Sequence, residues 1–289
     1  MSVLKAAVIQ LCSTADVQAN LRAVERLCER ACGQGAQLVV LPENFALFSP
    51  EERDKFAHAI HVVCTKGGPT GEGPILAAMQ SLARRLGVYL VLGGLPEHGP
   101  NVPTDMGRVF NTCLCLKPDG EIAAVYRKIH LFDVEFGHAA TKLCESATVA
   151  PGPADQVVVC ETPWGGLGLS ICYDLRFPEL YRRLVAASAT MLAVPAAFTL
   201  HTGKDHWRVL LCARAIENQC FVLAAAQQGQ HHPGRFTYGH SLIADPWGVV
   251  LCECPDGEGV AIAELDFSAL ERIRRQLPAL HHRRIDFLR

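Results

Sequence analysis

Short runs of Val, Ile, Leu, Ala and Cys, each about as long as a β-strand, recur along the whole chain. Some runs are separated by amphipathic helical segments, as Gln18–Cys32 separates Leu4–Leu11 from Gln37–Leu41. Others are joined by tight turns, such as the one at Pro118-Asp-Gly120. Parallel strands need helical crossovers whereas antiparallel strands need only short turns, so both connections together indicate a mixed sheet. The sequence therefore predicts an α/β (α+β) fold.

Helix start and stop signals recur between these runs. Ser49-Pro-Glu-Glu52 combines an N-cap serine, a proline at the first helical position and a glutamate three residues after the cap. Other helices are predicted at Pro74–Leu86 before Gly87, near Pro178-Glu179, at Asp205–Asn218, and at the end of the chain, where Ser268–Glu271 forms a capping box.

Two stretches are predicted to be irregular. Residues 133–155 show no sustained period and are rich in Gly, Pro, Ala and Thr, which is typical of a surface excursion. The glycine-rich segment Gly67–Gly73 is followed by no Gly-Lys-Ser/Thr, and we expect no strand before it. A phosphate-binding loop is therefore excluded there.

Charge and cysteine content exclude several functional classes. The 27 Lys and Arg against 29 Asp and Glu give a net charge of −2, so no basic nucleic-acid surface is expected. The longest apolar runs, such as Met191–Phe198, are less than half as long as a bilayer span, and the amino terminus lacks a signal-peptide pattern. The 13 Cys form no disulfide framework. We expect a cytoplasmic protein with reduced thiols and, without linkers or repeats, a single domain over residues 1–289.

Cys172 differs from the other cysteines, most of which we expect in the core. It follows the apolar run Leu167–Ile171 and precedes a turn that leads into the helix near Pro178. Such a connection presents a side chain at the end of a sheet, as nucleophile elbows do. The helix N-terminus just beyond is expected to favour the thiolate. No C-x-x-C spacing occurs, so no structural zinc site is expected.

A cysteine nucleophile needs a base. Several of the 12 His stand in pairs, His231-His232 and His281-His282, within predicted surface segments where solvated side chains are the usual outcome. Glu43 and Lys128 instead follow hydrophobic strands, and a carboxylate at a strand end beside a lysine can act as the base. These two residues and Cys172 are therefore the candidate catalytic group.

Three motifs that contain these residues resemble, in order and context, those of the nitrilase superfamily of carbon–nitrogen hydrolases. The motifs are Leu41–Asn44, Tyr126–Phe132 and Ser170–Glu179. The resemblance covers essentially the whole chain, and within the superfamily it is closest to the branch that contains deaminated glutathione amidase. The segments that carry this branch resemblance are His206–Glu217, Tyr238–Ser241, Asp245–Gly248 and His282–Arg284.

The resemblance implies a four-layer α-β-β-α sandwich that pairs with a second subunit, and neither a metal nor an organic cofactor. It makes Cys172 the nucleophile, Glu43 the general base, and Lys128 with the backbone N–H of Tyr173 the groups that stabilise the tetrahedral intermediate. Glu145 matches a second glutamate of the family. The stretch Phe136–Ala140 before it departs from the usual Pro-Gly pattern, so the geometry of this loop decides whether Glu145 reaches the site.

The resemblance also suggests which residues hold the substrate. Arg176, four residues after the nucleophile, is placed to bind a substrate carboxylate, with a surface ion pair to Glu179 as the alternative. Phe198 and Thr202 resemble positions that line the acyl pocket in the amidase branch. An apolar wall with one hydroxyl would complement a short chain that ends in a carboxylate.

The predicted reaction is hydrolysis of a small-molecule amide, a γ-glutamyl-like 2-oxo acid, with deaminated glutathione as the first choice. The alternatives are an omega-amidase for 2-oxoglutaramate or 2-oxosuccinamate, and an inactive family member that acts as a binding protein. The three filled catalytic positions argue against the last. The helix 205–218 carries more apolar residues than one buried stripe requires, which favours a homodimer over burial within the monomer.

Overall fold

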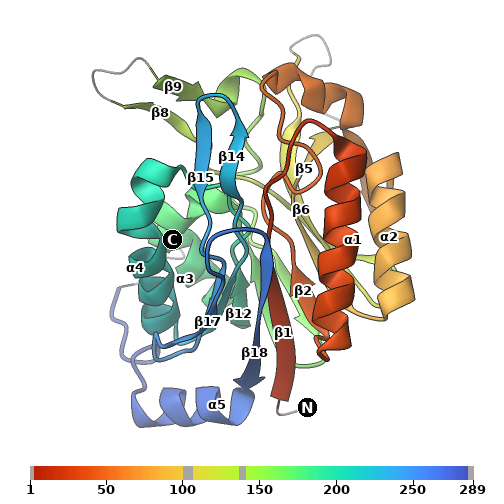
Figure 1. Ribbon diagram of the computed structural model, residues 1–289. Helices are drawn as coiled ribbons and strands as arrows, with labels where there is room; N and C mark the ends of the chain where they lie inside the picture. Colours follow the sequence, from red (N-terminus) through yellow and green to blue (C-terminus); the bar gives the residue numbers. More distant parts are fainter. Residues whose placement is uncertain (1–2, 100–106, 137–140, 286–289) are drawn as a thin grey trace.

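Two mixed β-sheets pack face to face in the computed structural model, which describes residues 3–99, 107–136 and 141–285 (Figure 1). The first sheet has the order β18-β1-β2-β5-β3-β4, with β6 paired to β5 and β7 to β6. Its strands are β1 (Val3–Gln10), β2 (Leu38–Val40), β3 (Ile60–Thr65), β4 (Gly68–Glu72), β5 (Tyr89–His98), β6 (Phe110–Leu116), β7 (Ile122–Arg127) and β18 (Gly259–Asp266).

The second sheet has six strands in the order β10-β11-β12-β13-β16-β17. They are β10 (Val159–Thr162), β11 (Gly165–Leu169), β12 (Ala189–Ala193), β13 (Phe221–Ala224), β16 (Leu242–Ala244) and β17 (Val250–Glu253). The central pairs β11–β12 and β12–β13 are parallel, and β10, β16 and β17 are attached antiparallel. Both sheets are thus mixed, as the two kinds of connection in the sequence predict.

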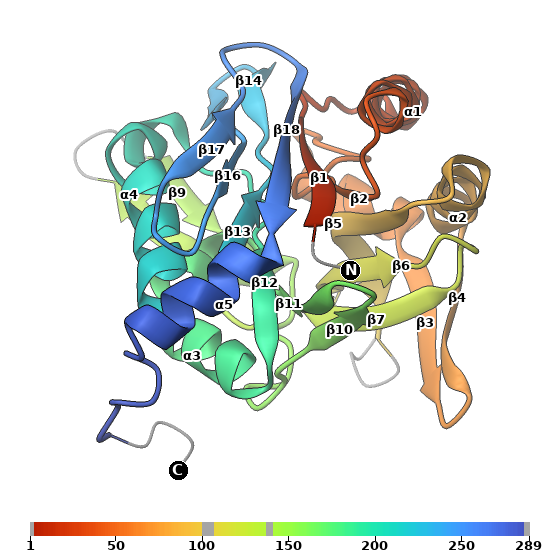
Figure 2. The same ribbon diagram turned by 90° about the horizontal axis from the view of Figure 1, so that it is seen from below.

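Helices cover the outer face of each sheet (Figure 2). They are α1 (Val17–Gly33) and α2 (Pro74–Leu86) on the first sheet and α3 (Pro178–Ala186) and α4 (Leu200–Asn218) on the second, while α5 (Phe267–Gln276) follows β18. Strand β1 is buried on both faces: Ala7 and Ile9 join the core beneath α1 and α2, whereas Ala6 and Val8 join the core between the sheets. The predicted four-layer α-β-β-α sandwich is confirmed.

Three helix starts differ from the sequence prediction. The signal at Ser49 leads to a 3-10 helix, η1 (Glu52–His58), and Ser49 Oγ donates to Asp54 at 2.5 Å instead of capping a longer helix. Helix α5 is capped by Asp266, whose carboxylate accepts from Ser268 N, so the predicted capping box is wrong. Helix α4 begins five residues before Asp205, because the Thr199 side chain accepts from the N–H of Thr202.

Three hairpins were not expected. Strand β3 precedes the glycine-rich segment, which itself forms β4 of the first sheet, so the expectation that no strand precedes it is wrong. The predicted excursion 133–155 contains a hairpin of β8 (Asp133–Phe136) and β9 (Thr141–Cys144) followed by η3 (Glu145–Ala147). A further hairpin pairs β14 (Gln228–His232) with β15 (Arg235–Tyr238). The last two hairpins lie next to each other above the sheets in Figure 1.

Candidate active site

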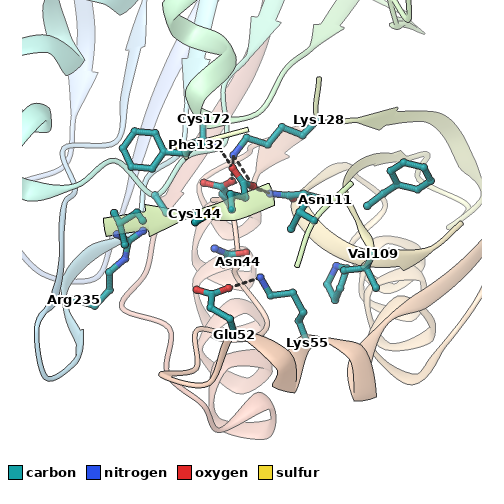
Figure 3. A pocket seen from close by; sticks show the side chains of 17 residues that line it. Asn44, Glu52, Lys55, Val109, Asn111, Lys128, Phe132, Cys144, Cys172 and Arg235 are labelled. Carbon is teal, nitrogen blue, oxygen red and sulfur yellow. Dashed lines mark hydrogen bonds and ion pairs between the residues drawn. The ribbon is translucent and has the colours of Figure 1, made fainter. Parts of the chain in front are cut away.

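The four side chains predicted to carry the chemistry meet at one end of the sandwich. Glu43 follows β2 and Lys128 follows β7, both in the first sheet, whereas Cys172 lies just after β11 in the second. Glu145 comes from η3, beyond the β8–β9 hairpin. All four line a cavity of about 190 Å³, here called the main cavity (Figure 3).

Lys128 is the centre of this group. Its ammonium donates to Glu43 Oε1 at 3.0 Å and to both carboxylate oxygens of Glu145 at 2.9 and 2.8 Å. The lysine is 2% exposed and Glu43 4%. Burial lowers the pKa of Lys128, but the charges of Glu145 and Glu43 outweigh it and hold that pKa well above the ordinary value. The cluster therefore keeps a fixed cation beside Cys172.

Cys172 is presented by a turn after an apolar strand, as predicted, and the backbone of this turn is strained. It begins the 3-10 turn η4 (Cys172–Arg176) with a φ of +49°, and its N–H donates to Pro195 O at 2.8 Å. Helix α3 starts only at Pro178. Burial raises the pKa of Cys172 well above its ordinary value, as do the charge of Glu43 and the hydrogen bond with it, while Lys128 opposes the rise. Burial and Glu43 thus act against the thiolate expected from the sequence, so a base beside Cys172 is needed to activate it.

Glu145 reaches the site despite the unusual stretch before it. Burial raises its pKa, but Lys128 and hydrogen bonds from Phe132 N and Asn111 bring that pKa below the ordinary value. The N–H of Phe132 donates to Glu145 Oε2 at 2.7 Å, which fixes the carboxylate that faces Lys128. Residues 137–140 of the atypical segment Phe136–Ala140 lie outside the described residues.

Asn111 was missed by the sequence interpretation. Its Nδ2 donates to Glu43 Oε1 at 2.9 Å and to Glu145 Oε1 at 3.2 Å, so it joins the two carboxylates. Gly94, at a positive φ of 69° in β5, makes room: a Cβ there would lie 2.8 Å from Asn111 Oδ1 and 2.9 Å from Glu43 Cγ. The available signal was a single amide within the otherwise largely apolar strand β6.

Asp174 was also missed, although it lies inside a quoted motif. It is fully buried and accepts from the hydroxyl of Tyr126 at 2.7 Å and from the N–H of Ile171 at 2.8 Å. His130 Nδ1 lies 2.7 Å from its other oxygen. Tyr126 and His130 flank Lys128, so Asp174 ties the segment that carries the lysine to the turn that carries the nucleophile.

The predicted substrate-binding residues surround Cys172 on another side. Tyr173, Arg176, Phe198 and Thr202 line a smaller cavity of about 10 Å³, here called the side cavity, which borders Cys172. The Arg176 guanidinium lies 5.2 Å from the ring centre of Phe198 and bonds His206 Nδ1 at 3.2 Å, rather than pairing with Glu179. The structure brings the four residues together, and their roles remain predictions.

Metal ligation finds little support at this site. Glu43, Glu145 and Cys172 are potential ligands, but the Lys128 ammonium is bonded to both carboxylates and holds the space between them. Within residues 3–99, 107–136 and 141–285, no three His, Cys, Asp or Glu side chains are grouped to hold a metal ion. That the chain needs neither a metal nor an organic cofactor stays a prediction.

Comparison with known proteins identifies the family. Residues 5–275 match the carbon-nitrogen hydrolase family model. The deaminated glutathione amidase of Synechocystis sp. is 45% identical over 96% of this chain and 97% of its own length, and that of Homo sapiens is 43% identical over 97% and 82%.

Solved structures agree. Nit3 of Saccharomyces cerevisiae, a member of branch 10 of the nitrilase superfamily, has a TM-score of 0.83 at 32% identity and covers 98% of this chain and 97% of its own. The NitFhit protein of C. elegans has a TM-score of 0.86 at 38% identity. The matched region covers 98% of this chain and 66% of the NitFhit chain. The family match and these relationships show that the chain belongs to the carbon–nitrogen hydrolase family.

Proposed function

We propose that the chain is an amidase that cleaves through a thioester on Cys172. The observation that carries this proposal is the buried ammonium of Lys128, bonded to two carboxylates at a cavity that Cys172 also lines. A protonated thiol needs a base within reach, and the charge and hydrogen bond of Glu43 act on Cys172 directly. The same carboxylate can then return the proton to the departing amine.

The steps follow from this arrangement. The Glu43 carboxylate takes the thiol proton as the sulfur of Cys172 bonds to the amide carbon, and the carbonyl oxygen becomes an oxyanion. Lys128 and the backbone N–H of Tyr173 stabilise that oxyanion. The C–N bond then breaks, the amine leaves with the proton held by Glu43, and the acyl group stays on sulfur. Water then bonds to the thioester carbon as Glu43 takes its proton, the C–S bond breaks, the acid leaves, and Glu43 returns the proton to the sulfur.

Deaminated glutathione is the proposed substrate. Relatives with that activity in their name are 40–45% identical to the chain over nearly its full length. The second candidate, an omega-amidase for 2-oxoglutaramate, uses the same chemistry and keeps the same acyl group. An inactive binding protein would not require the assembled Glu43, Lys128 and Cys172.

Initial rates with deaminated glutathione, 2-oxoglutaramate and a simple nitrile test the substrate. Because binding energy from the amine half is available only in deaminated glutathione, its kcat/KM should exceed that of 2-oxoglutaramate by about tenfold or more. The nitrile should be the poorest. Equal or higher kcat/KM with 2-oxoglutaramate would favour the omega-amidase, and no turnover of any amide would favour the binding protein.

We further propose a homodimer formed in part by α4. Val209 and Ile216, seven residues apart on one face of α4, are 68% and 53% exposed. Trp247 and Val249 are exposed in the neighbouring turn, where a Cβ on Gly248 would touch Ile216. Isolated exposed apolar side chains are common, but a contiguous group of large ones marks an interface.

Sedimentation tests this expectation. The wild-type chain should sediment as a dimer at micromolar concentration, and a Val209→Glu/Ile216→Glu variant should sediment as a monomer, because two carboxylates in the interface would be desolvated. Substitution of the exposed Val63, on β3 far along the first sheet, to Glu is the control. A wild-type monomer at this concentration would refute the dimer.

The compartment and domain organisation are proposed on simpler grounds. All 13 cysteines are free, which suits the reducing cytoplasm. No helix in the described part of the chain has the length and apolar character needed to cross a membrane. A single hydrolase domain over 1–289 is supported by a family match that begins at residue 5 and ends at 275.

A further inference from the structure

Two cavities meet at the nucleophile, and each contains an arginine. The main and side cavities share Phe132, Cys172 and Ala197 in their linings. Arg176 lies in the side cavity and Arg235 in the main cavity. An amide bound at Cys172 has two halves that must leave the carbonyl carbon in different directions, so an arginine in each direction suits a substrate with a charge on both halves.

The outer part of the main cavity carries two cations, of which only one is paired. Lys55 of η1 forms an ion pair with Glu52 and donates to Thr148 Oγ1 at 3.2 Å. Arg235 at the start of β15 is half-buried, and within the described residues no carboxylate lies within ion-pair distance of it. Figure 3 shows Arg235 and the Lys55–Glu52 pair set apart from Lys128 and Cys172. Arg235 is therefore the cation of the main cavity that is available to an anionic ligand.

Arg235 is held in place by aromatic stacking. Its guanidinium lies 5.6 Å from the ring centre of Phe48, and that ring stacks on His231 with 3.9 Å between centroids and 4° between planes. His231 is fixed in turn: its Nδ1 lies 2.7 Å from the carbonyl oxygen of Ser13, and its Nε2 lies 2.7 Å from the Thr237 hydroxyl. Burial lowers the pKa of His231 to about 4, so it adds no positive charge at neutral pH. An arginine positioned in this way loses little freedom when it binds a carboxylate.

We propose that Arg235 binds the terminal carboxylate of the amine half of the substrate, which in deaminated glutathione is the carboxylate of the glycine residue. This inference rests on the proposed function. The amine half is a dipeptide and is longer than the 2-oxo acyl half, so it requires the larger cavity. The guanidinium can bond both oxygens of a carboxylate. Arg235 then acts as a specificity-determining residue that distinguishes deaminated glutathione from 2-oxoglutaramate, which lacks this carboxylate.

The test compares two substrates in wild type and in Arg235→Gln. The kcat/KM for deaminated glutathione should fall by about tenfold to a hundredfold, mainly through KM, because the carboxylate contact exists before and during the reaction. The kcat/KM for 2-oxoglutaramate should change less than about twofold, since that substrate makes no such contact. Arg235→Lys should recover part of the loss. The matched control is Arg26→Gln. Arg26 lies on the outer helix α1, where it forms an exposed ion pair with Glu258, so this substitution should leave kcat/KM unchanged for both substrates.

A modified substrate gives an independent measurement. In wild type, converting the terminal carboxylate of deaminated glutathione to a primary amide should lower kcat/KM by the same factor as Arg235→Gln does with the natural substrate. In Arg235→Gln, the same change of substrate should lower kcat/KM little further, because both changes remove one contact. Two results would overturn the role of Arg235 and leave the proposed function intact. One is an equal loss of kcat/KM for both natural substrates in Arg235→Gln, and the other is a loss with the amide-modified substrate that adds to the loss from Arg235→Gln. A wild type without preference for deaminated glutathione would overturn both.

Discussion

Cys172→Ala is expected to abolish turnover while the protein remains folded. The sulfur forms the acyl-enzyme, and the nearby carboxylates and ammonium of the cluster cannot replace it as a nucleophile for an amide. Removing a cysteine nucleophile costs about three orders of magnitude or more in kcat when the remaining groups act as a unit with it. The strained φ of +49° is carried by the backbone, which Pro195 holds through the N–H of residue 172, so the turn should persist.

Steady-state rates and thermal unfolding followed by circular dichroism measure the two halves of this expectation. Cys220→Ala is the matched control, because it removes the same atom from a fully buried position in the second-sheet core, where Cys220 contacts Ala189 and Arg274 rather than the cavity. The control should lose some stability and keep its kcat. More than a few per cent of the wild-type rate in Cys172→Ala would refute the nucleophile assignment.

Glu43→Gln is expected to stop acylation, whereas Glu145→Gln should slow it and leave it measurable. Glu43 takes the proton of a thiol whose pKa is raised, and an amide side chain cannot do so, which predicts a loss of about a hundredfold to ten-thousandfold. Glu145 accepts two hydrogen bonds from the Lys128 ammonium, so its substitution leaves that ammonium less firmly positioned but does not remove the base. In either variant one carboxylate remains on Lys128, so the buried ammonium is not left unpaired.

A thiol-reactive probe and a single-turnover assay separate these two roles. Glu145→Gln should still be labelled at Cys172 and form some acyl-enzyme, whereas Glu43→Gln should be labelled slowly and form none. Identical acylation kinetics in the two variants, or full activity of Glu145→Gln, would contradict this division of roles.

The strand-end placement of the catalytic candidates is the part of the site that the sequence predicts best. Glu43, Lys128 and Cys172 each follow an apolar run. An apolar run of strand length can be recognised from the local sequence, without knowledge of tertiary contacts. The layers follow from the same runs, because strands that are hydrophobic on both faces need cover on both sides. The motif resemblance then supplies the pairing of the two sheets, which no local pattern contains.

What the sequence did not predict depends on contacts between distant segments. Asn111 is a single amide in a strand, and it becomes significant only when Gly94 of β5 leaves room beside it. The β14–β15 strands are short and largely polar, with buried His231 and Thr237 in place of an apolar face, so alternation gives no strand signal there. The raised pKa of Cys172 depends on burial and on the nearby Glu43, and neither can be deduced from a helix start in the sequence.

The placement of base and nucleophile on opposite sheets has a consequence for a position that takes no part in the chemistry. Gly93 of β5 lies so close to Pro195, in the segment after β12, that a Cβ on the glycine would come 2.2 Å from the Cβ of the proline. A side chain at position 93 would push these segments apart and with them Glu43 and Cys172, which follow strands of different sheets. We therefore expect Gly93→Ala to lose turnover by displacing the base from the nucleophile, although both groups are still present.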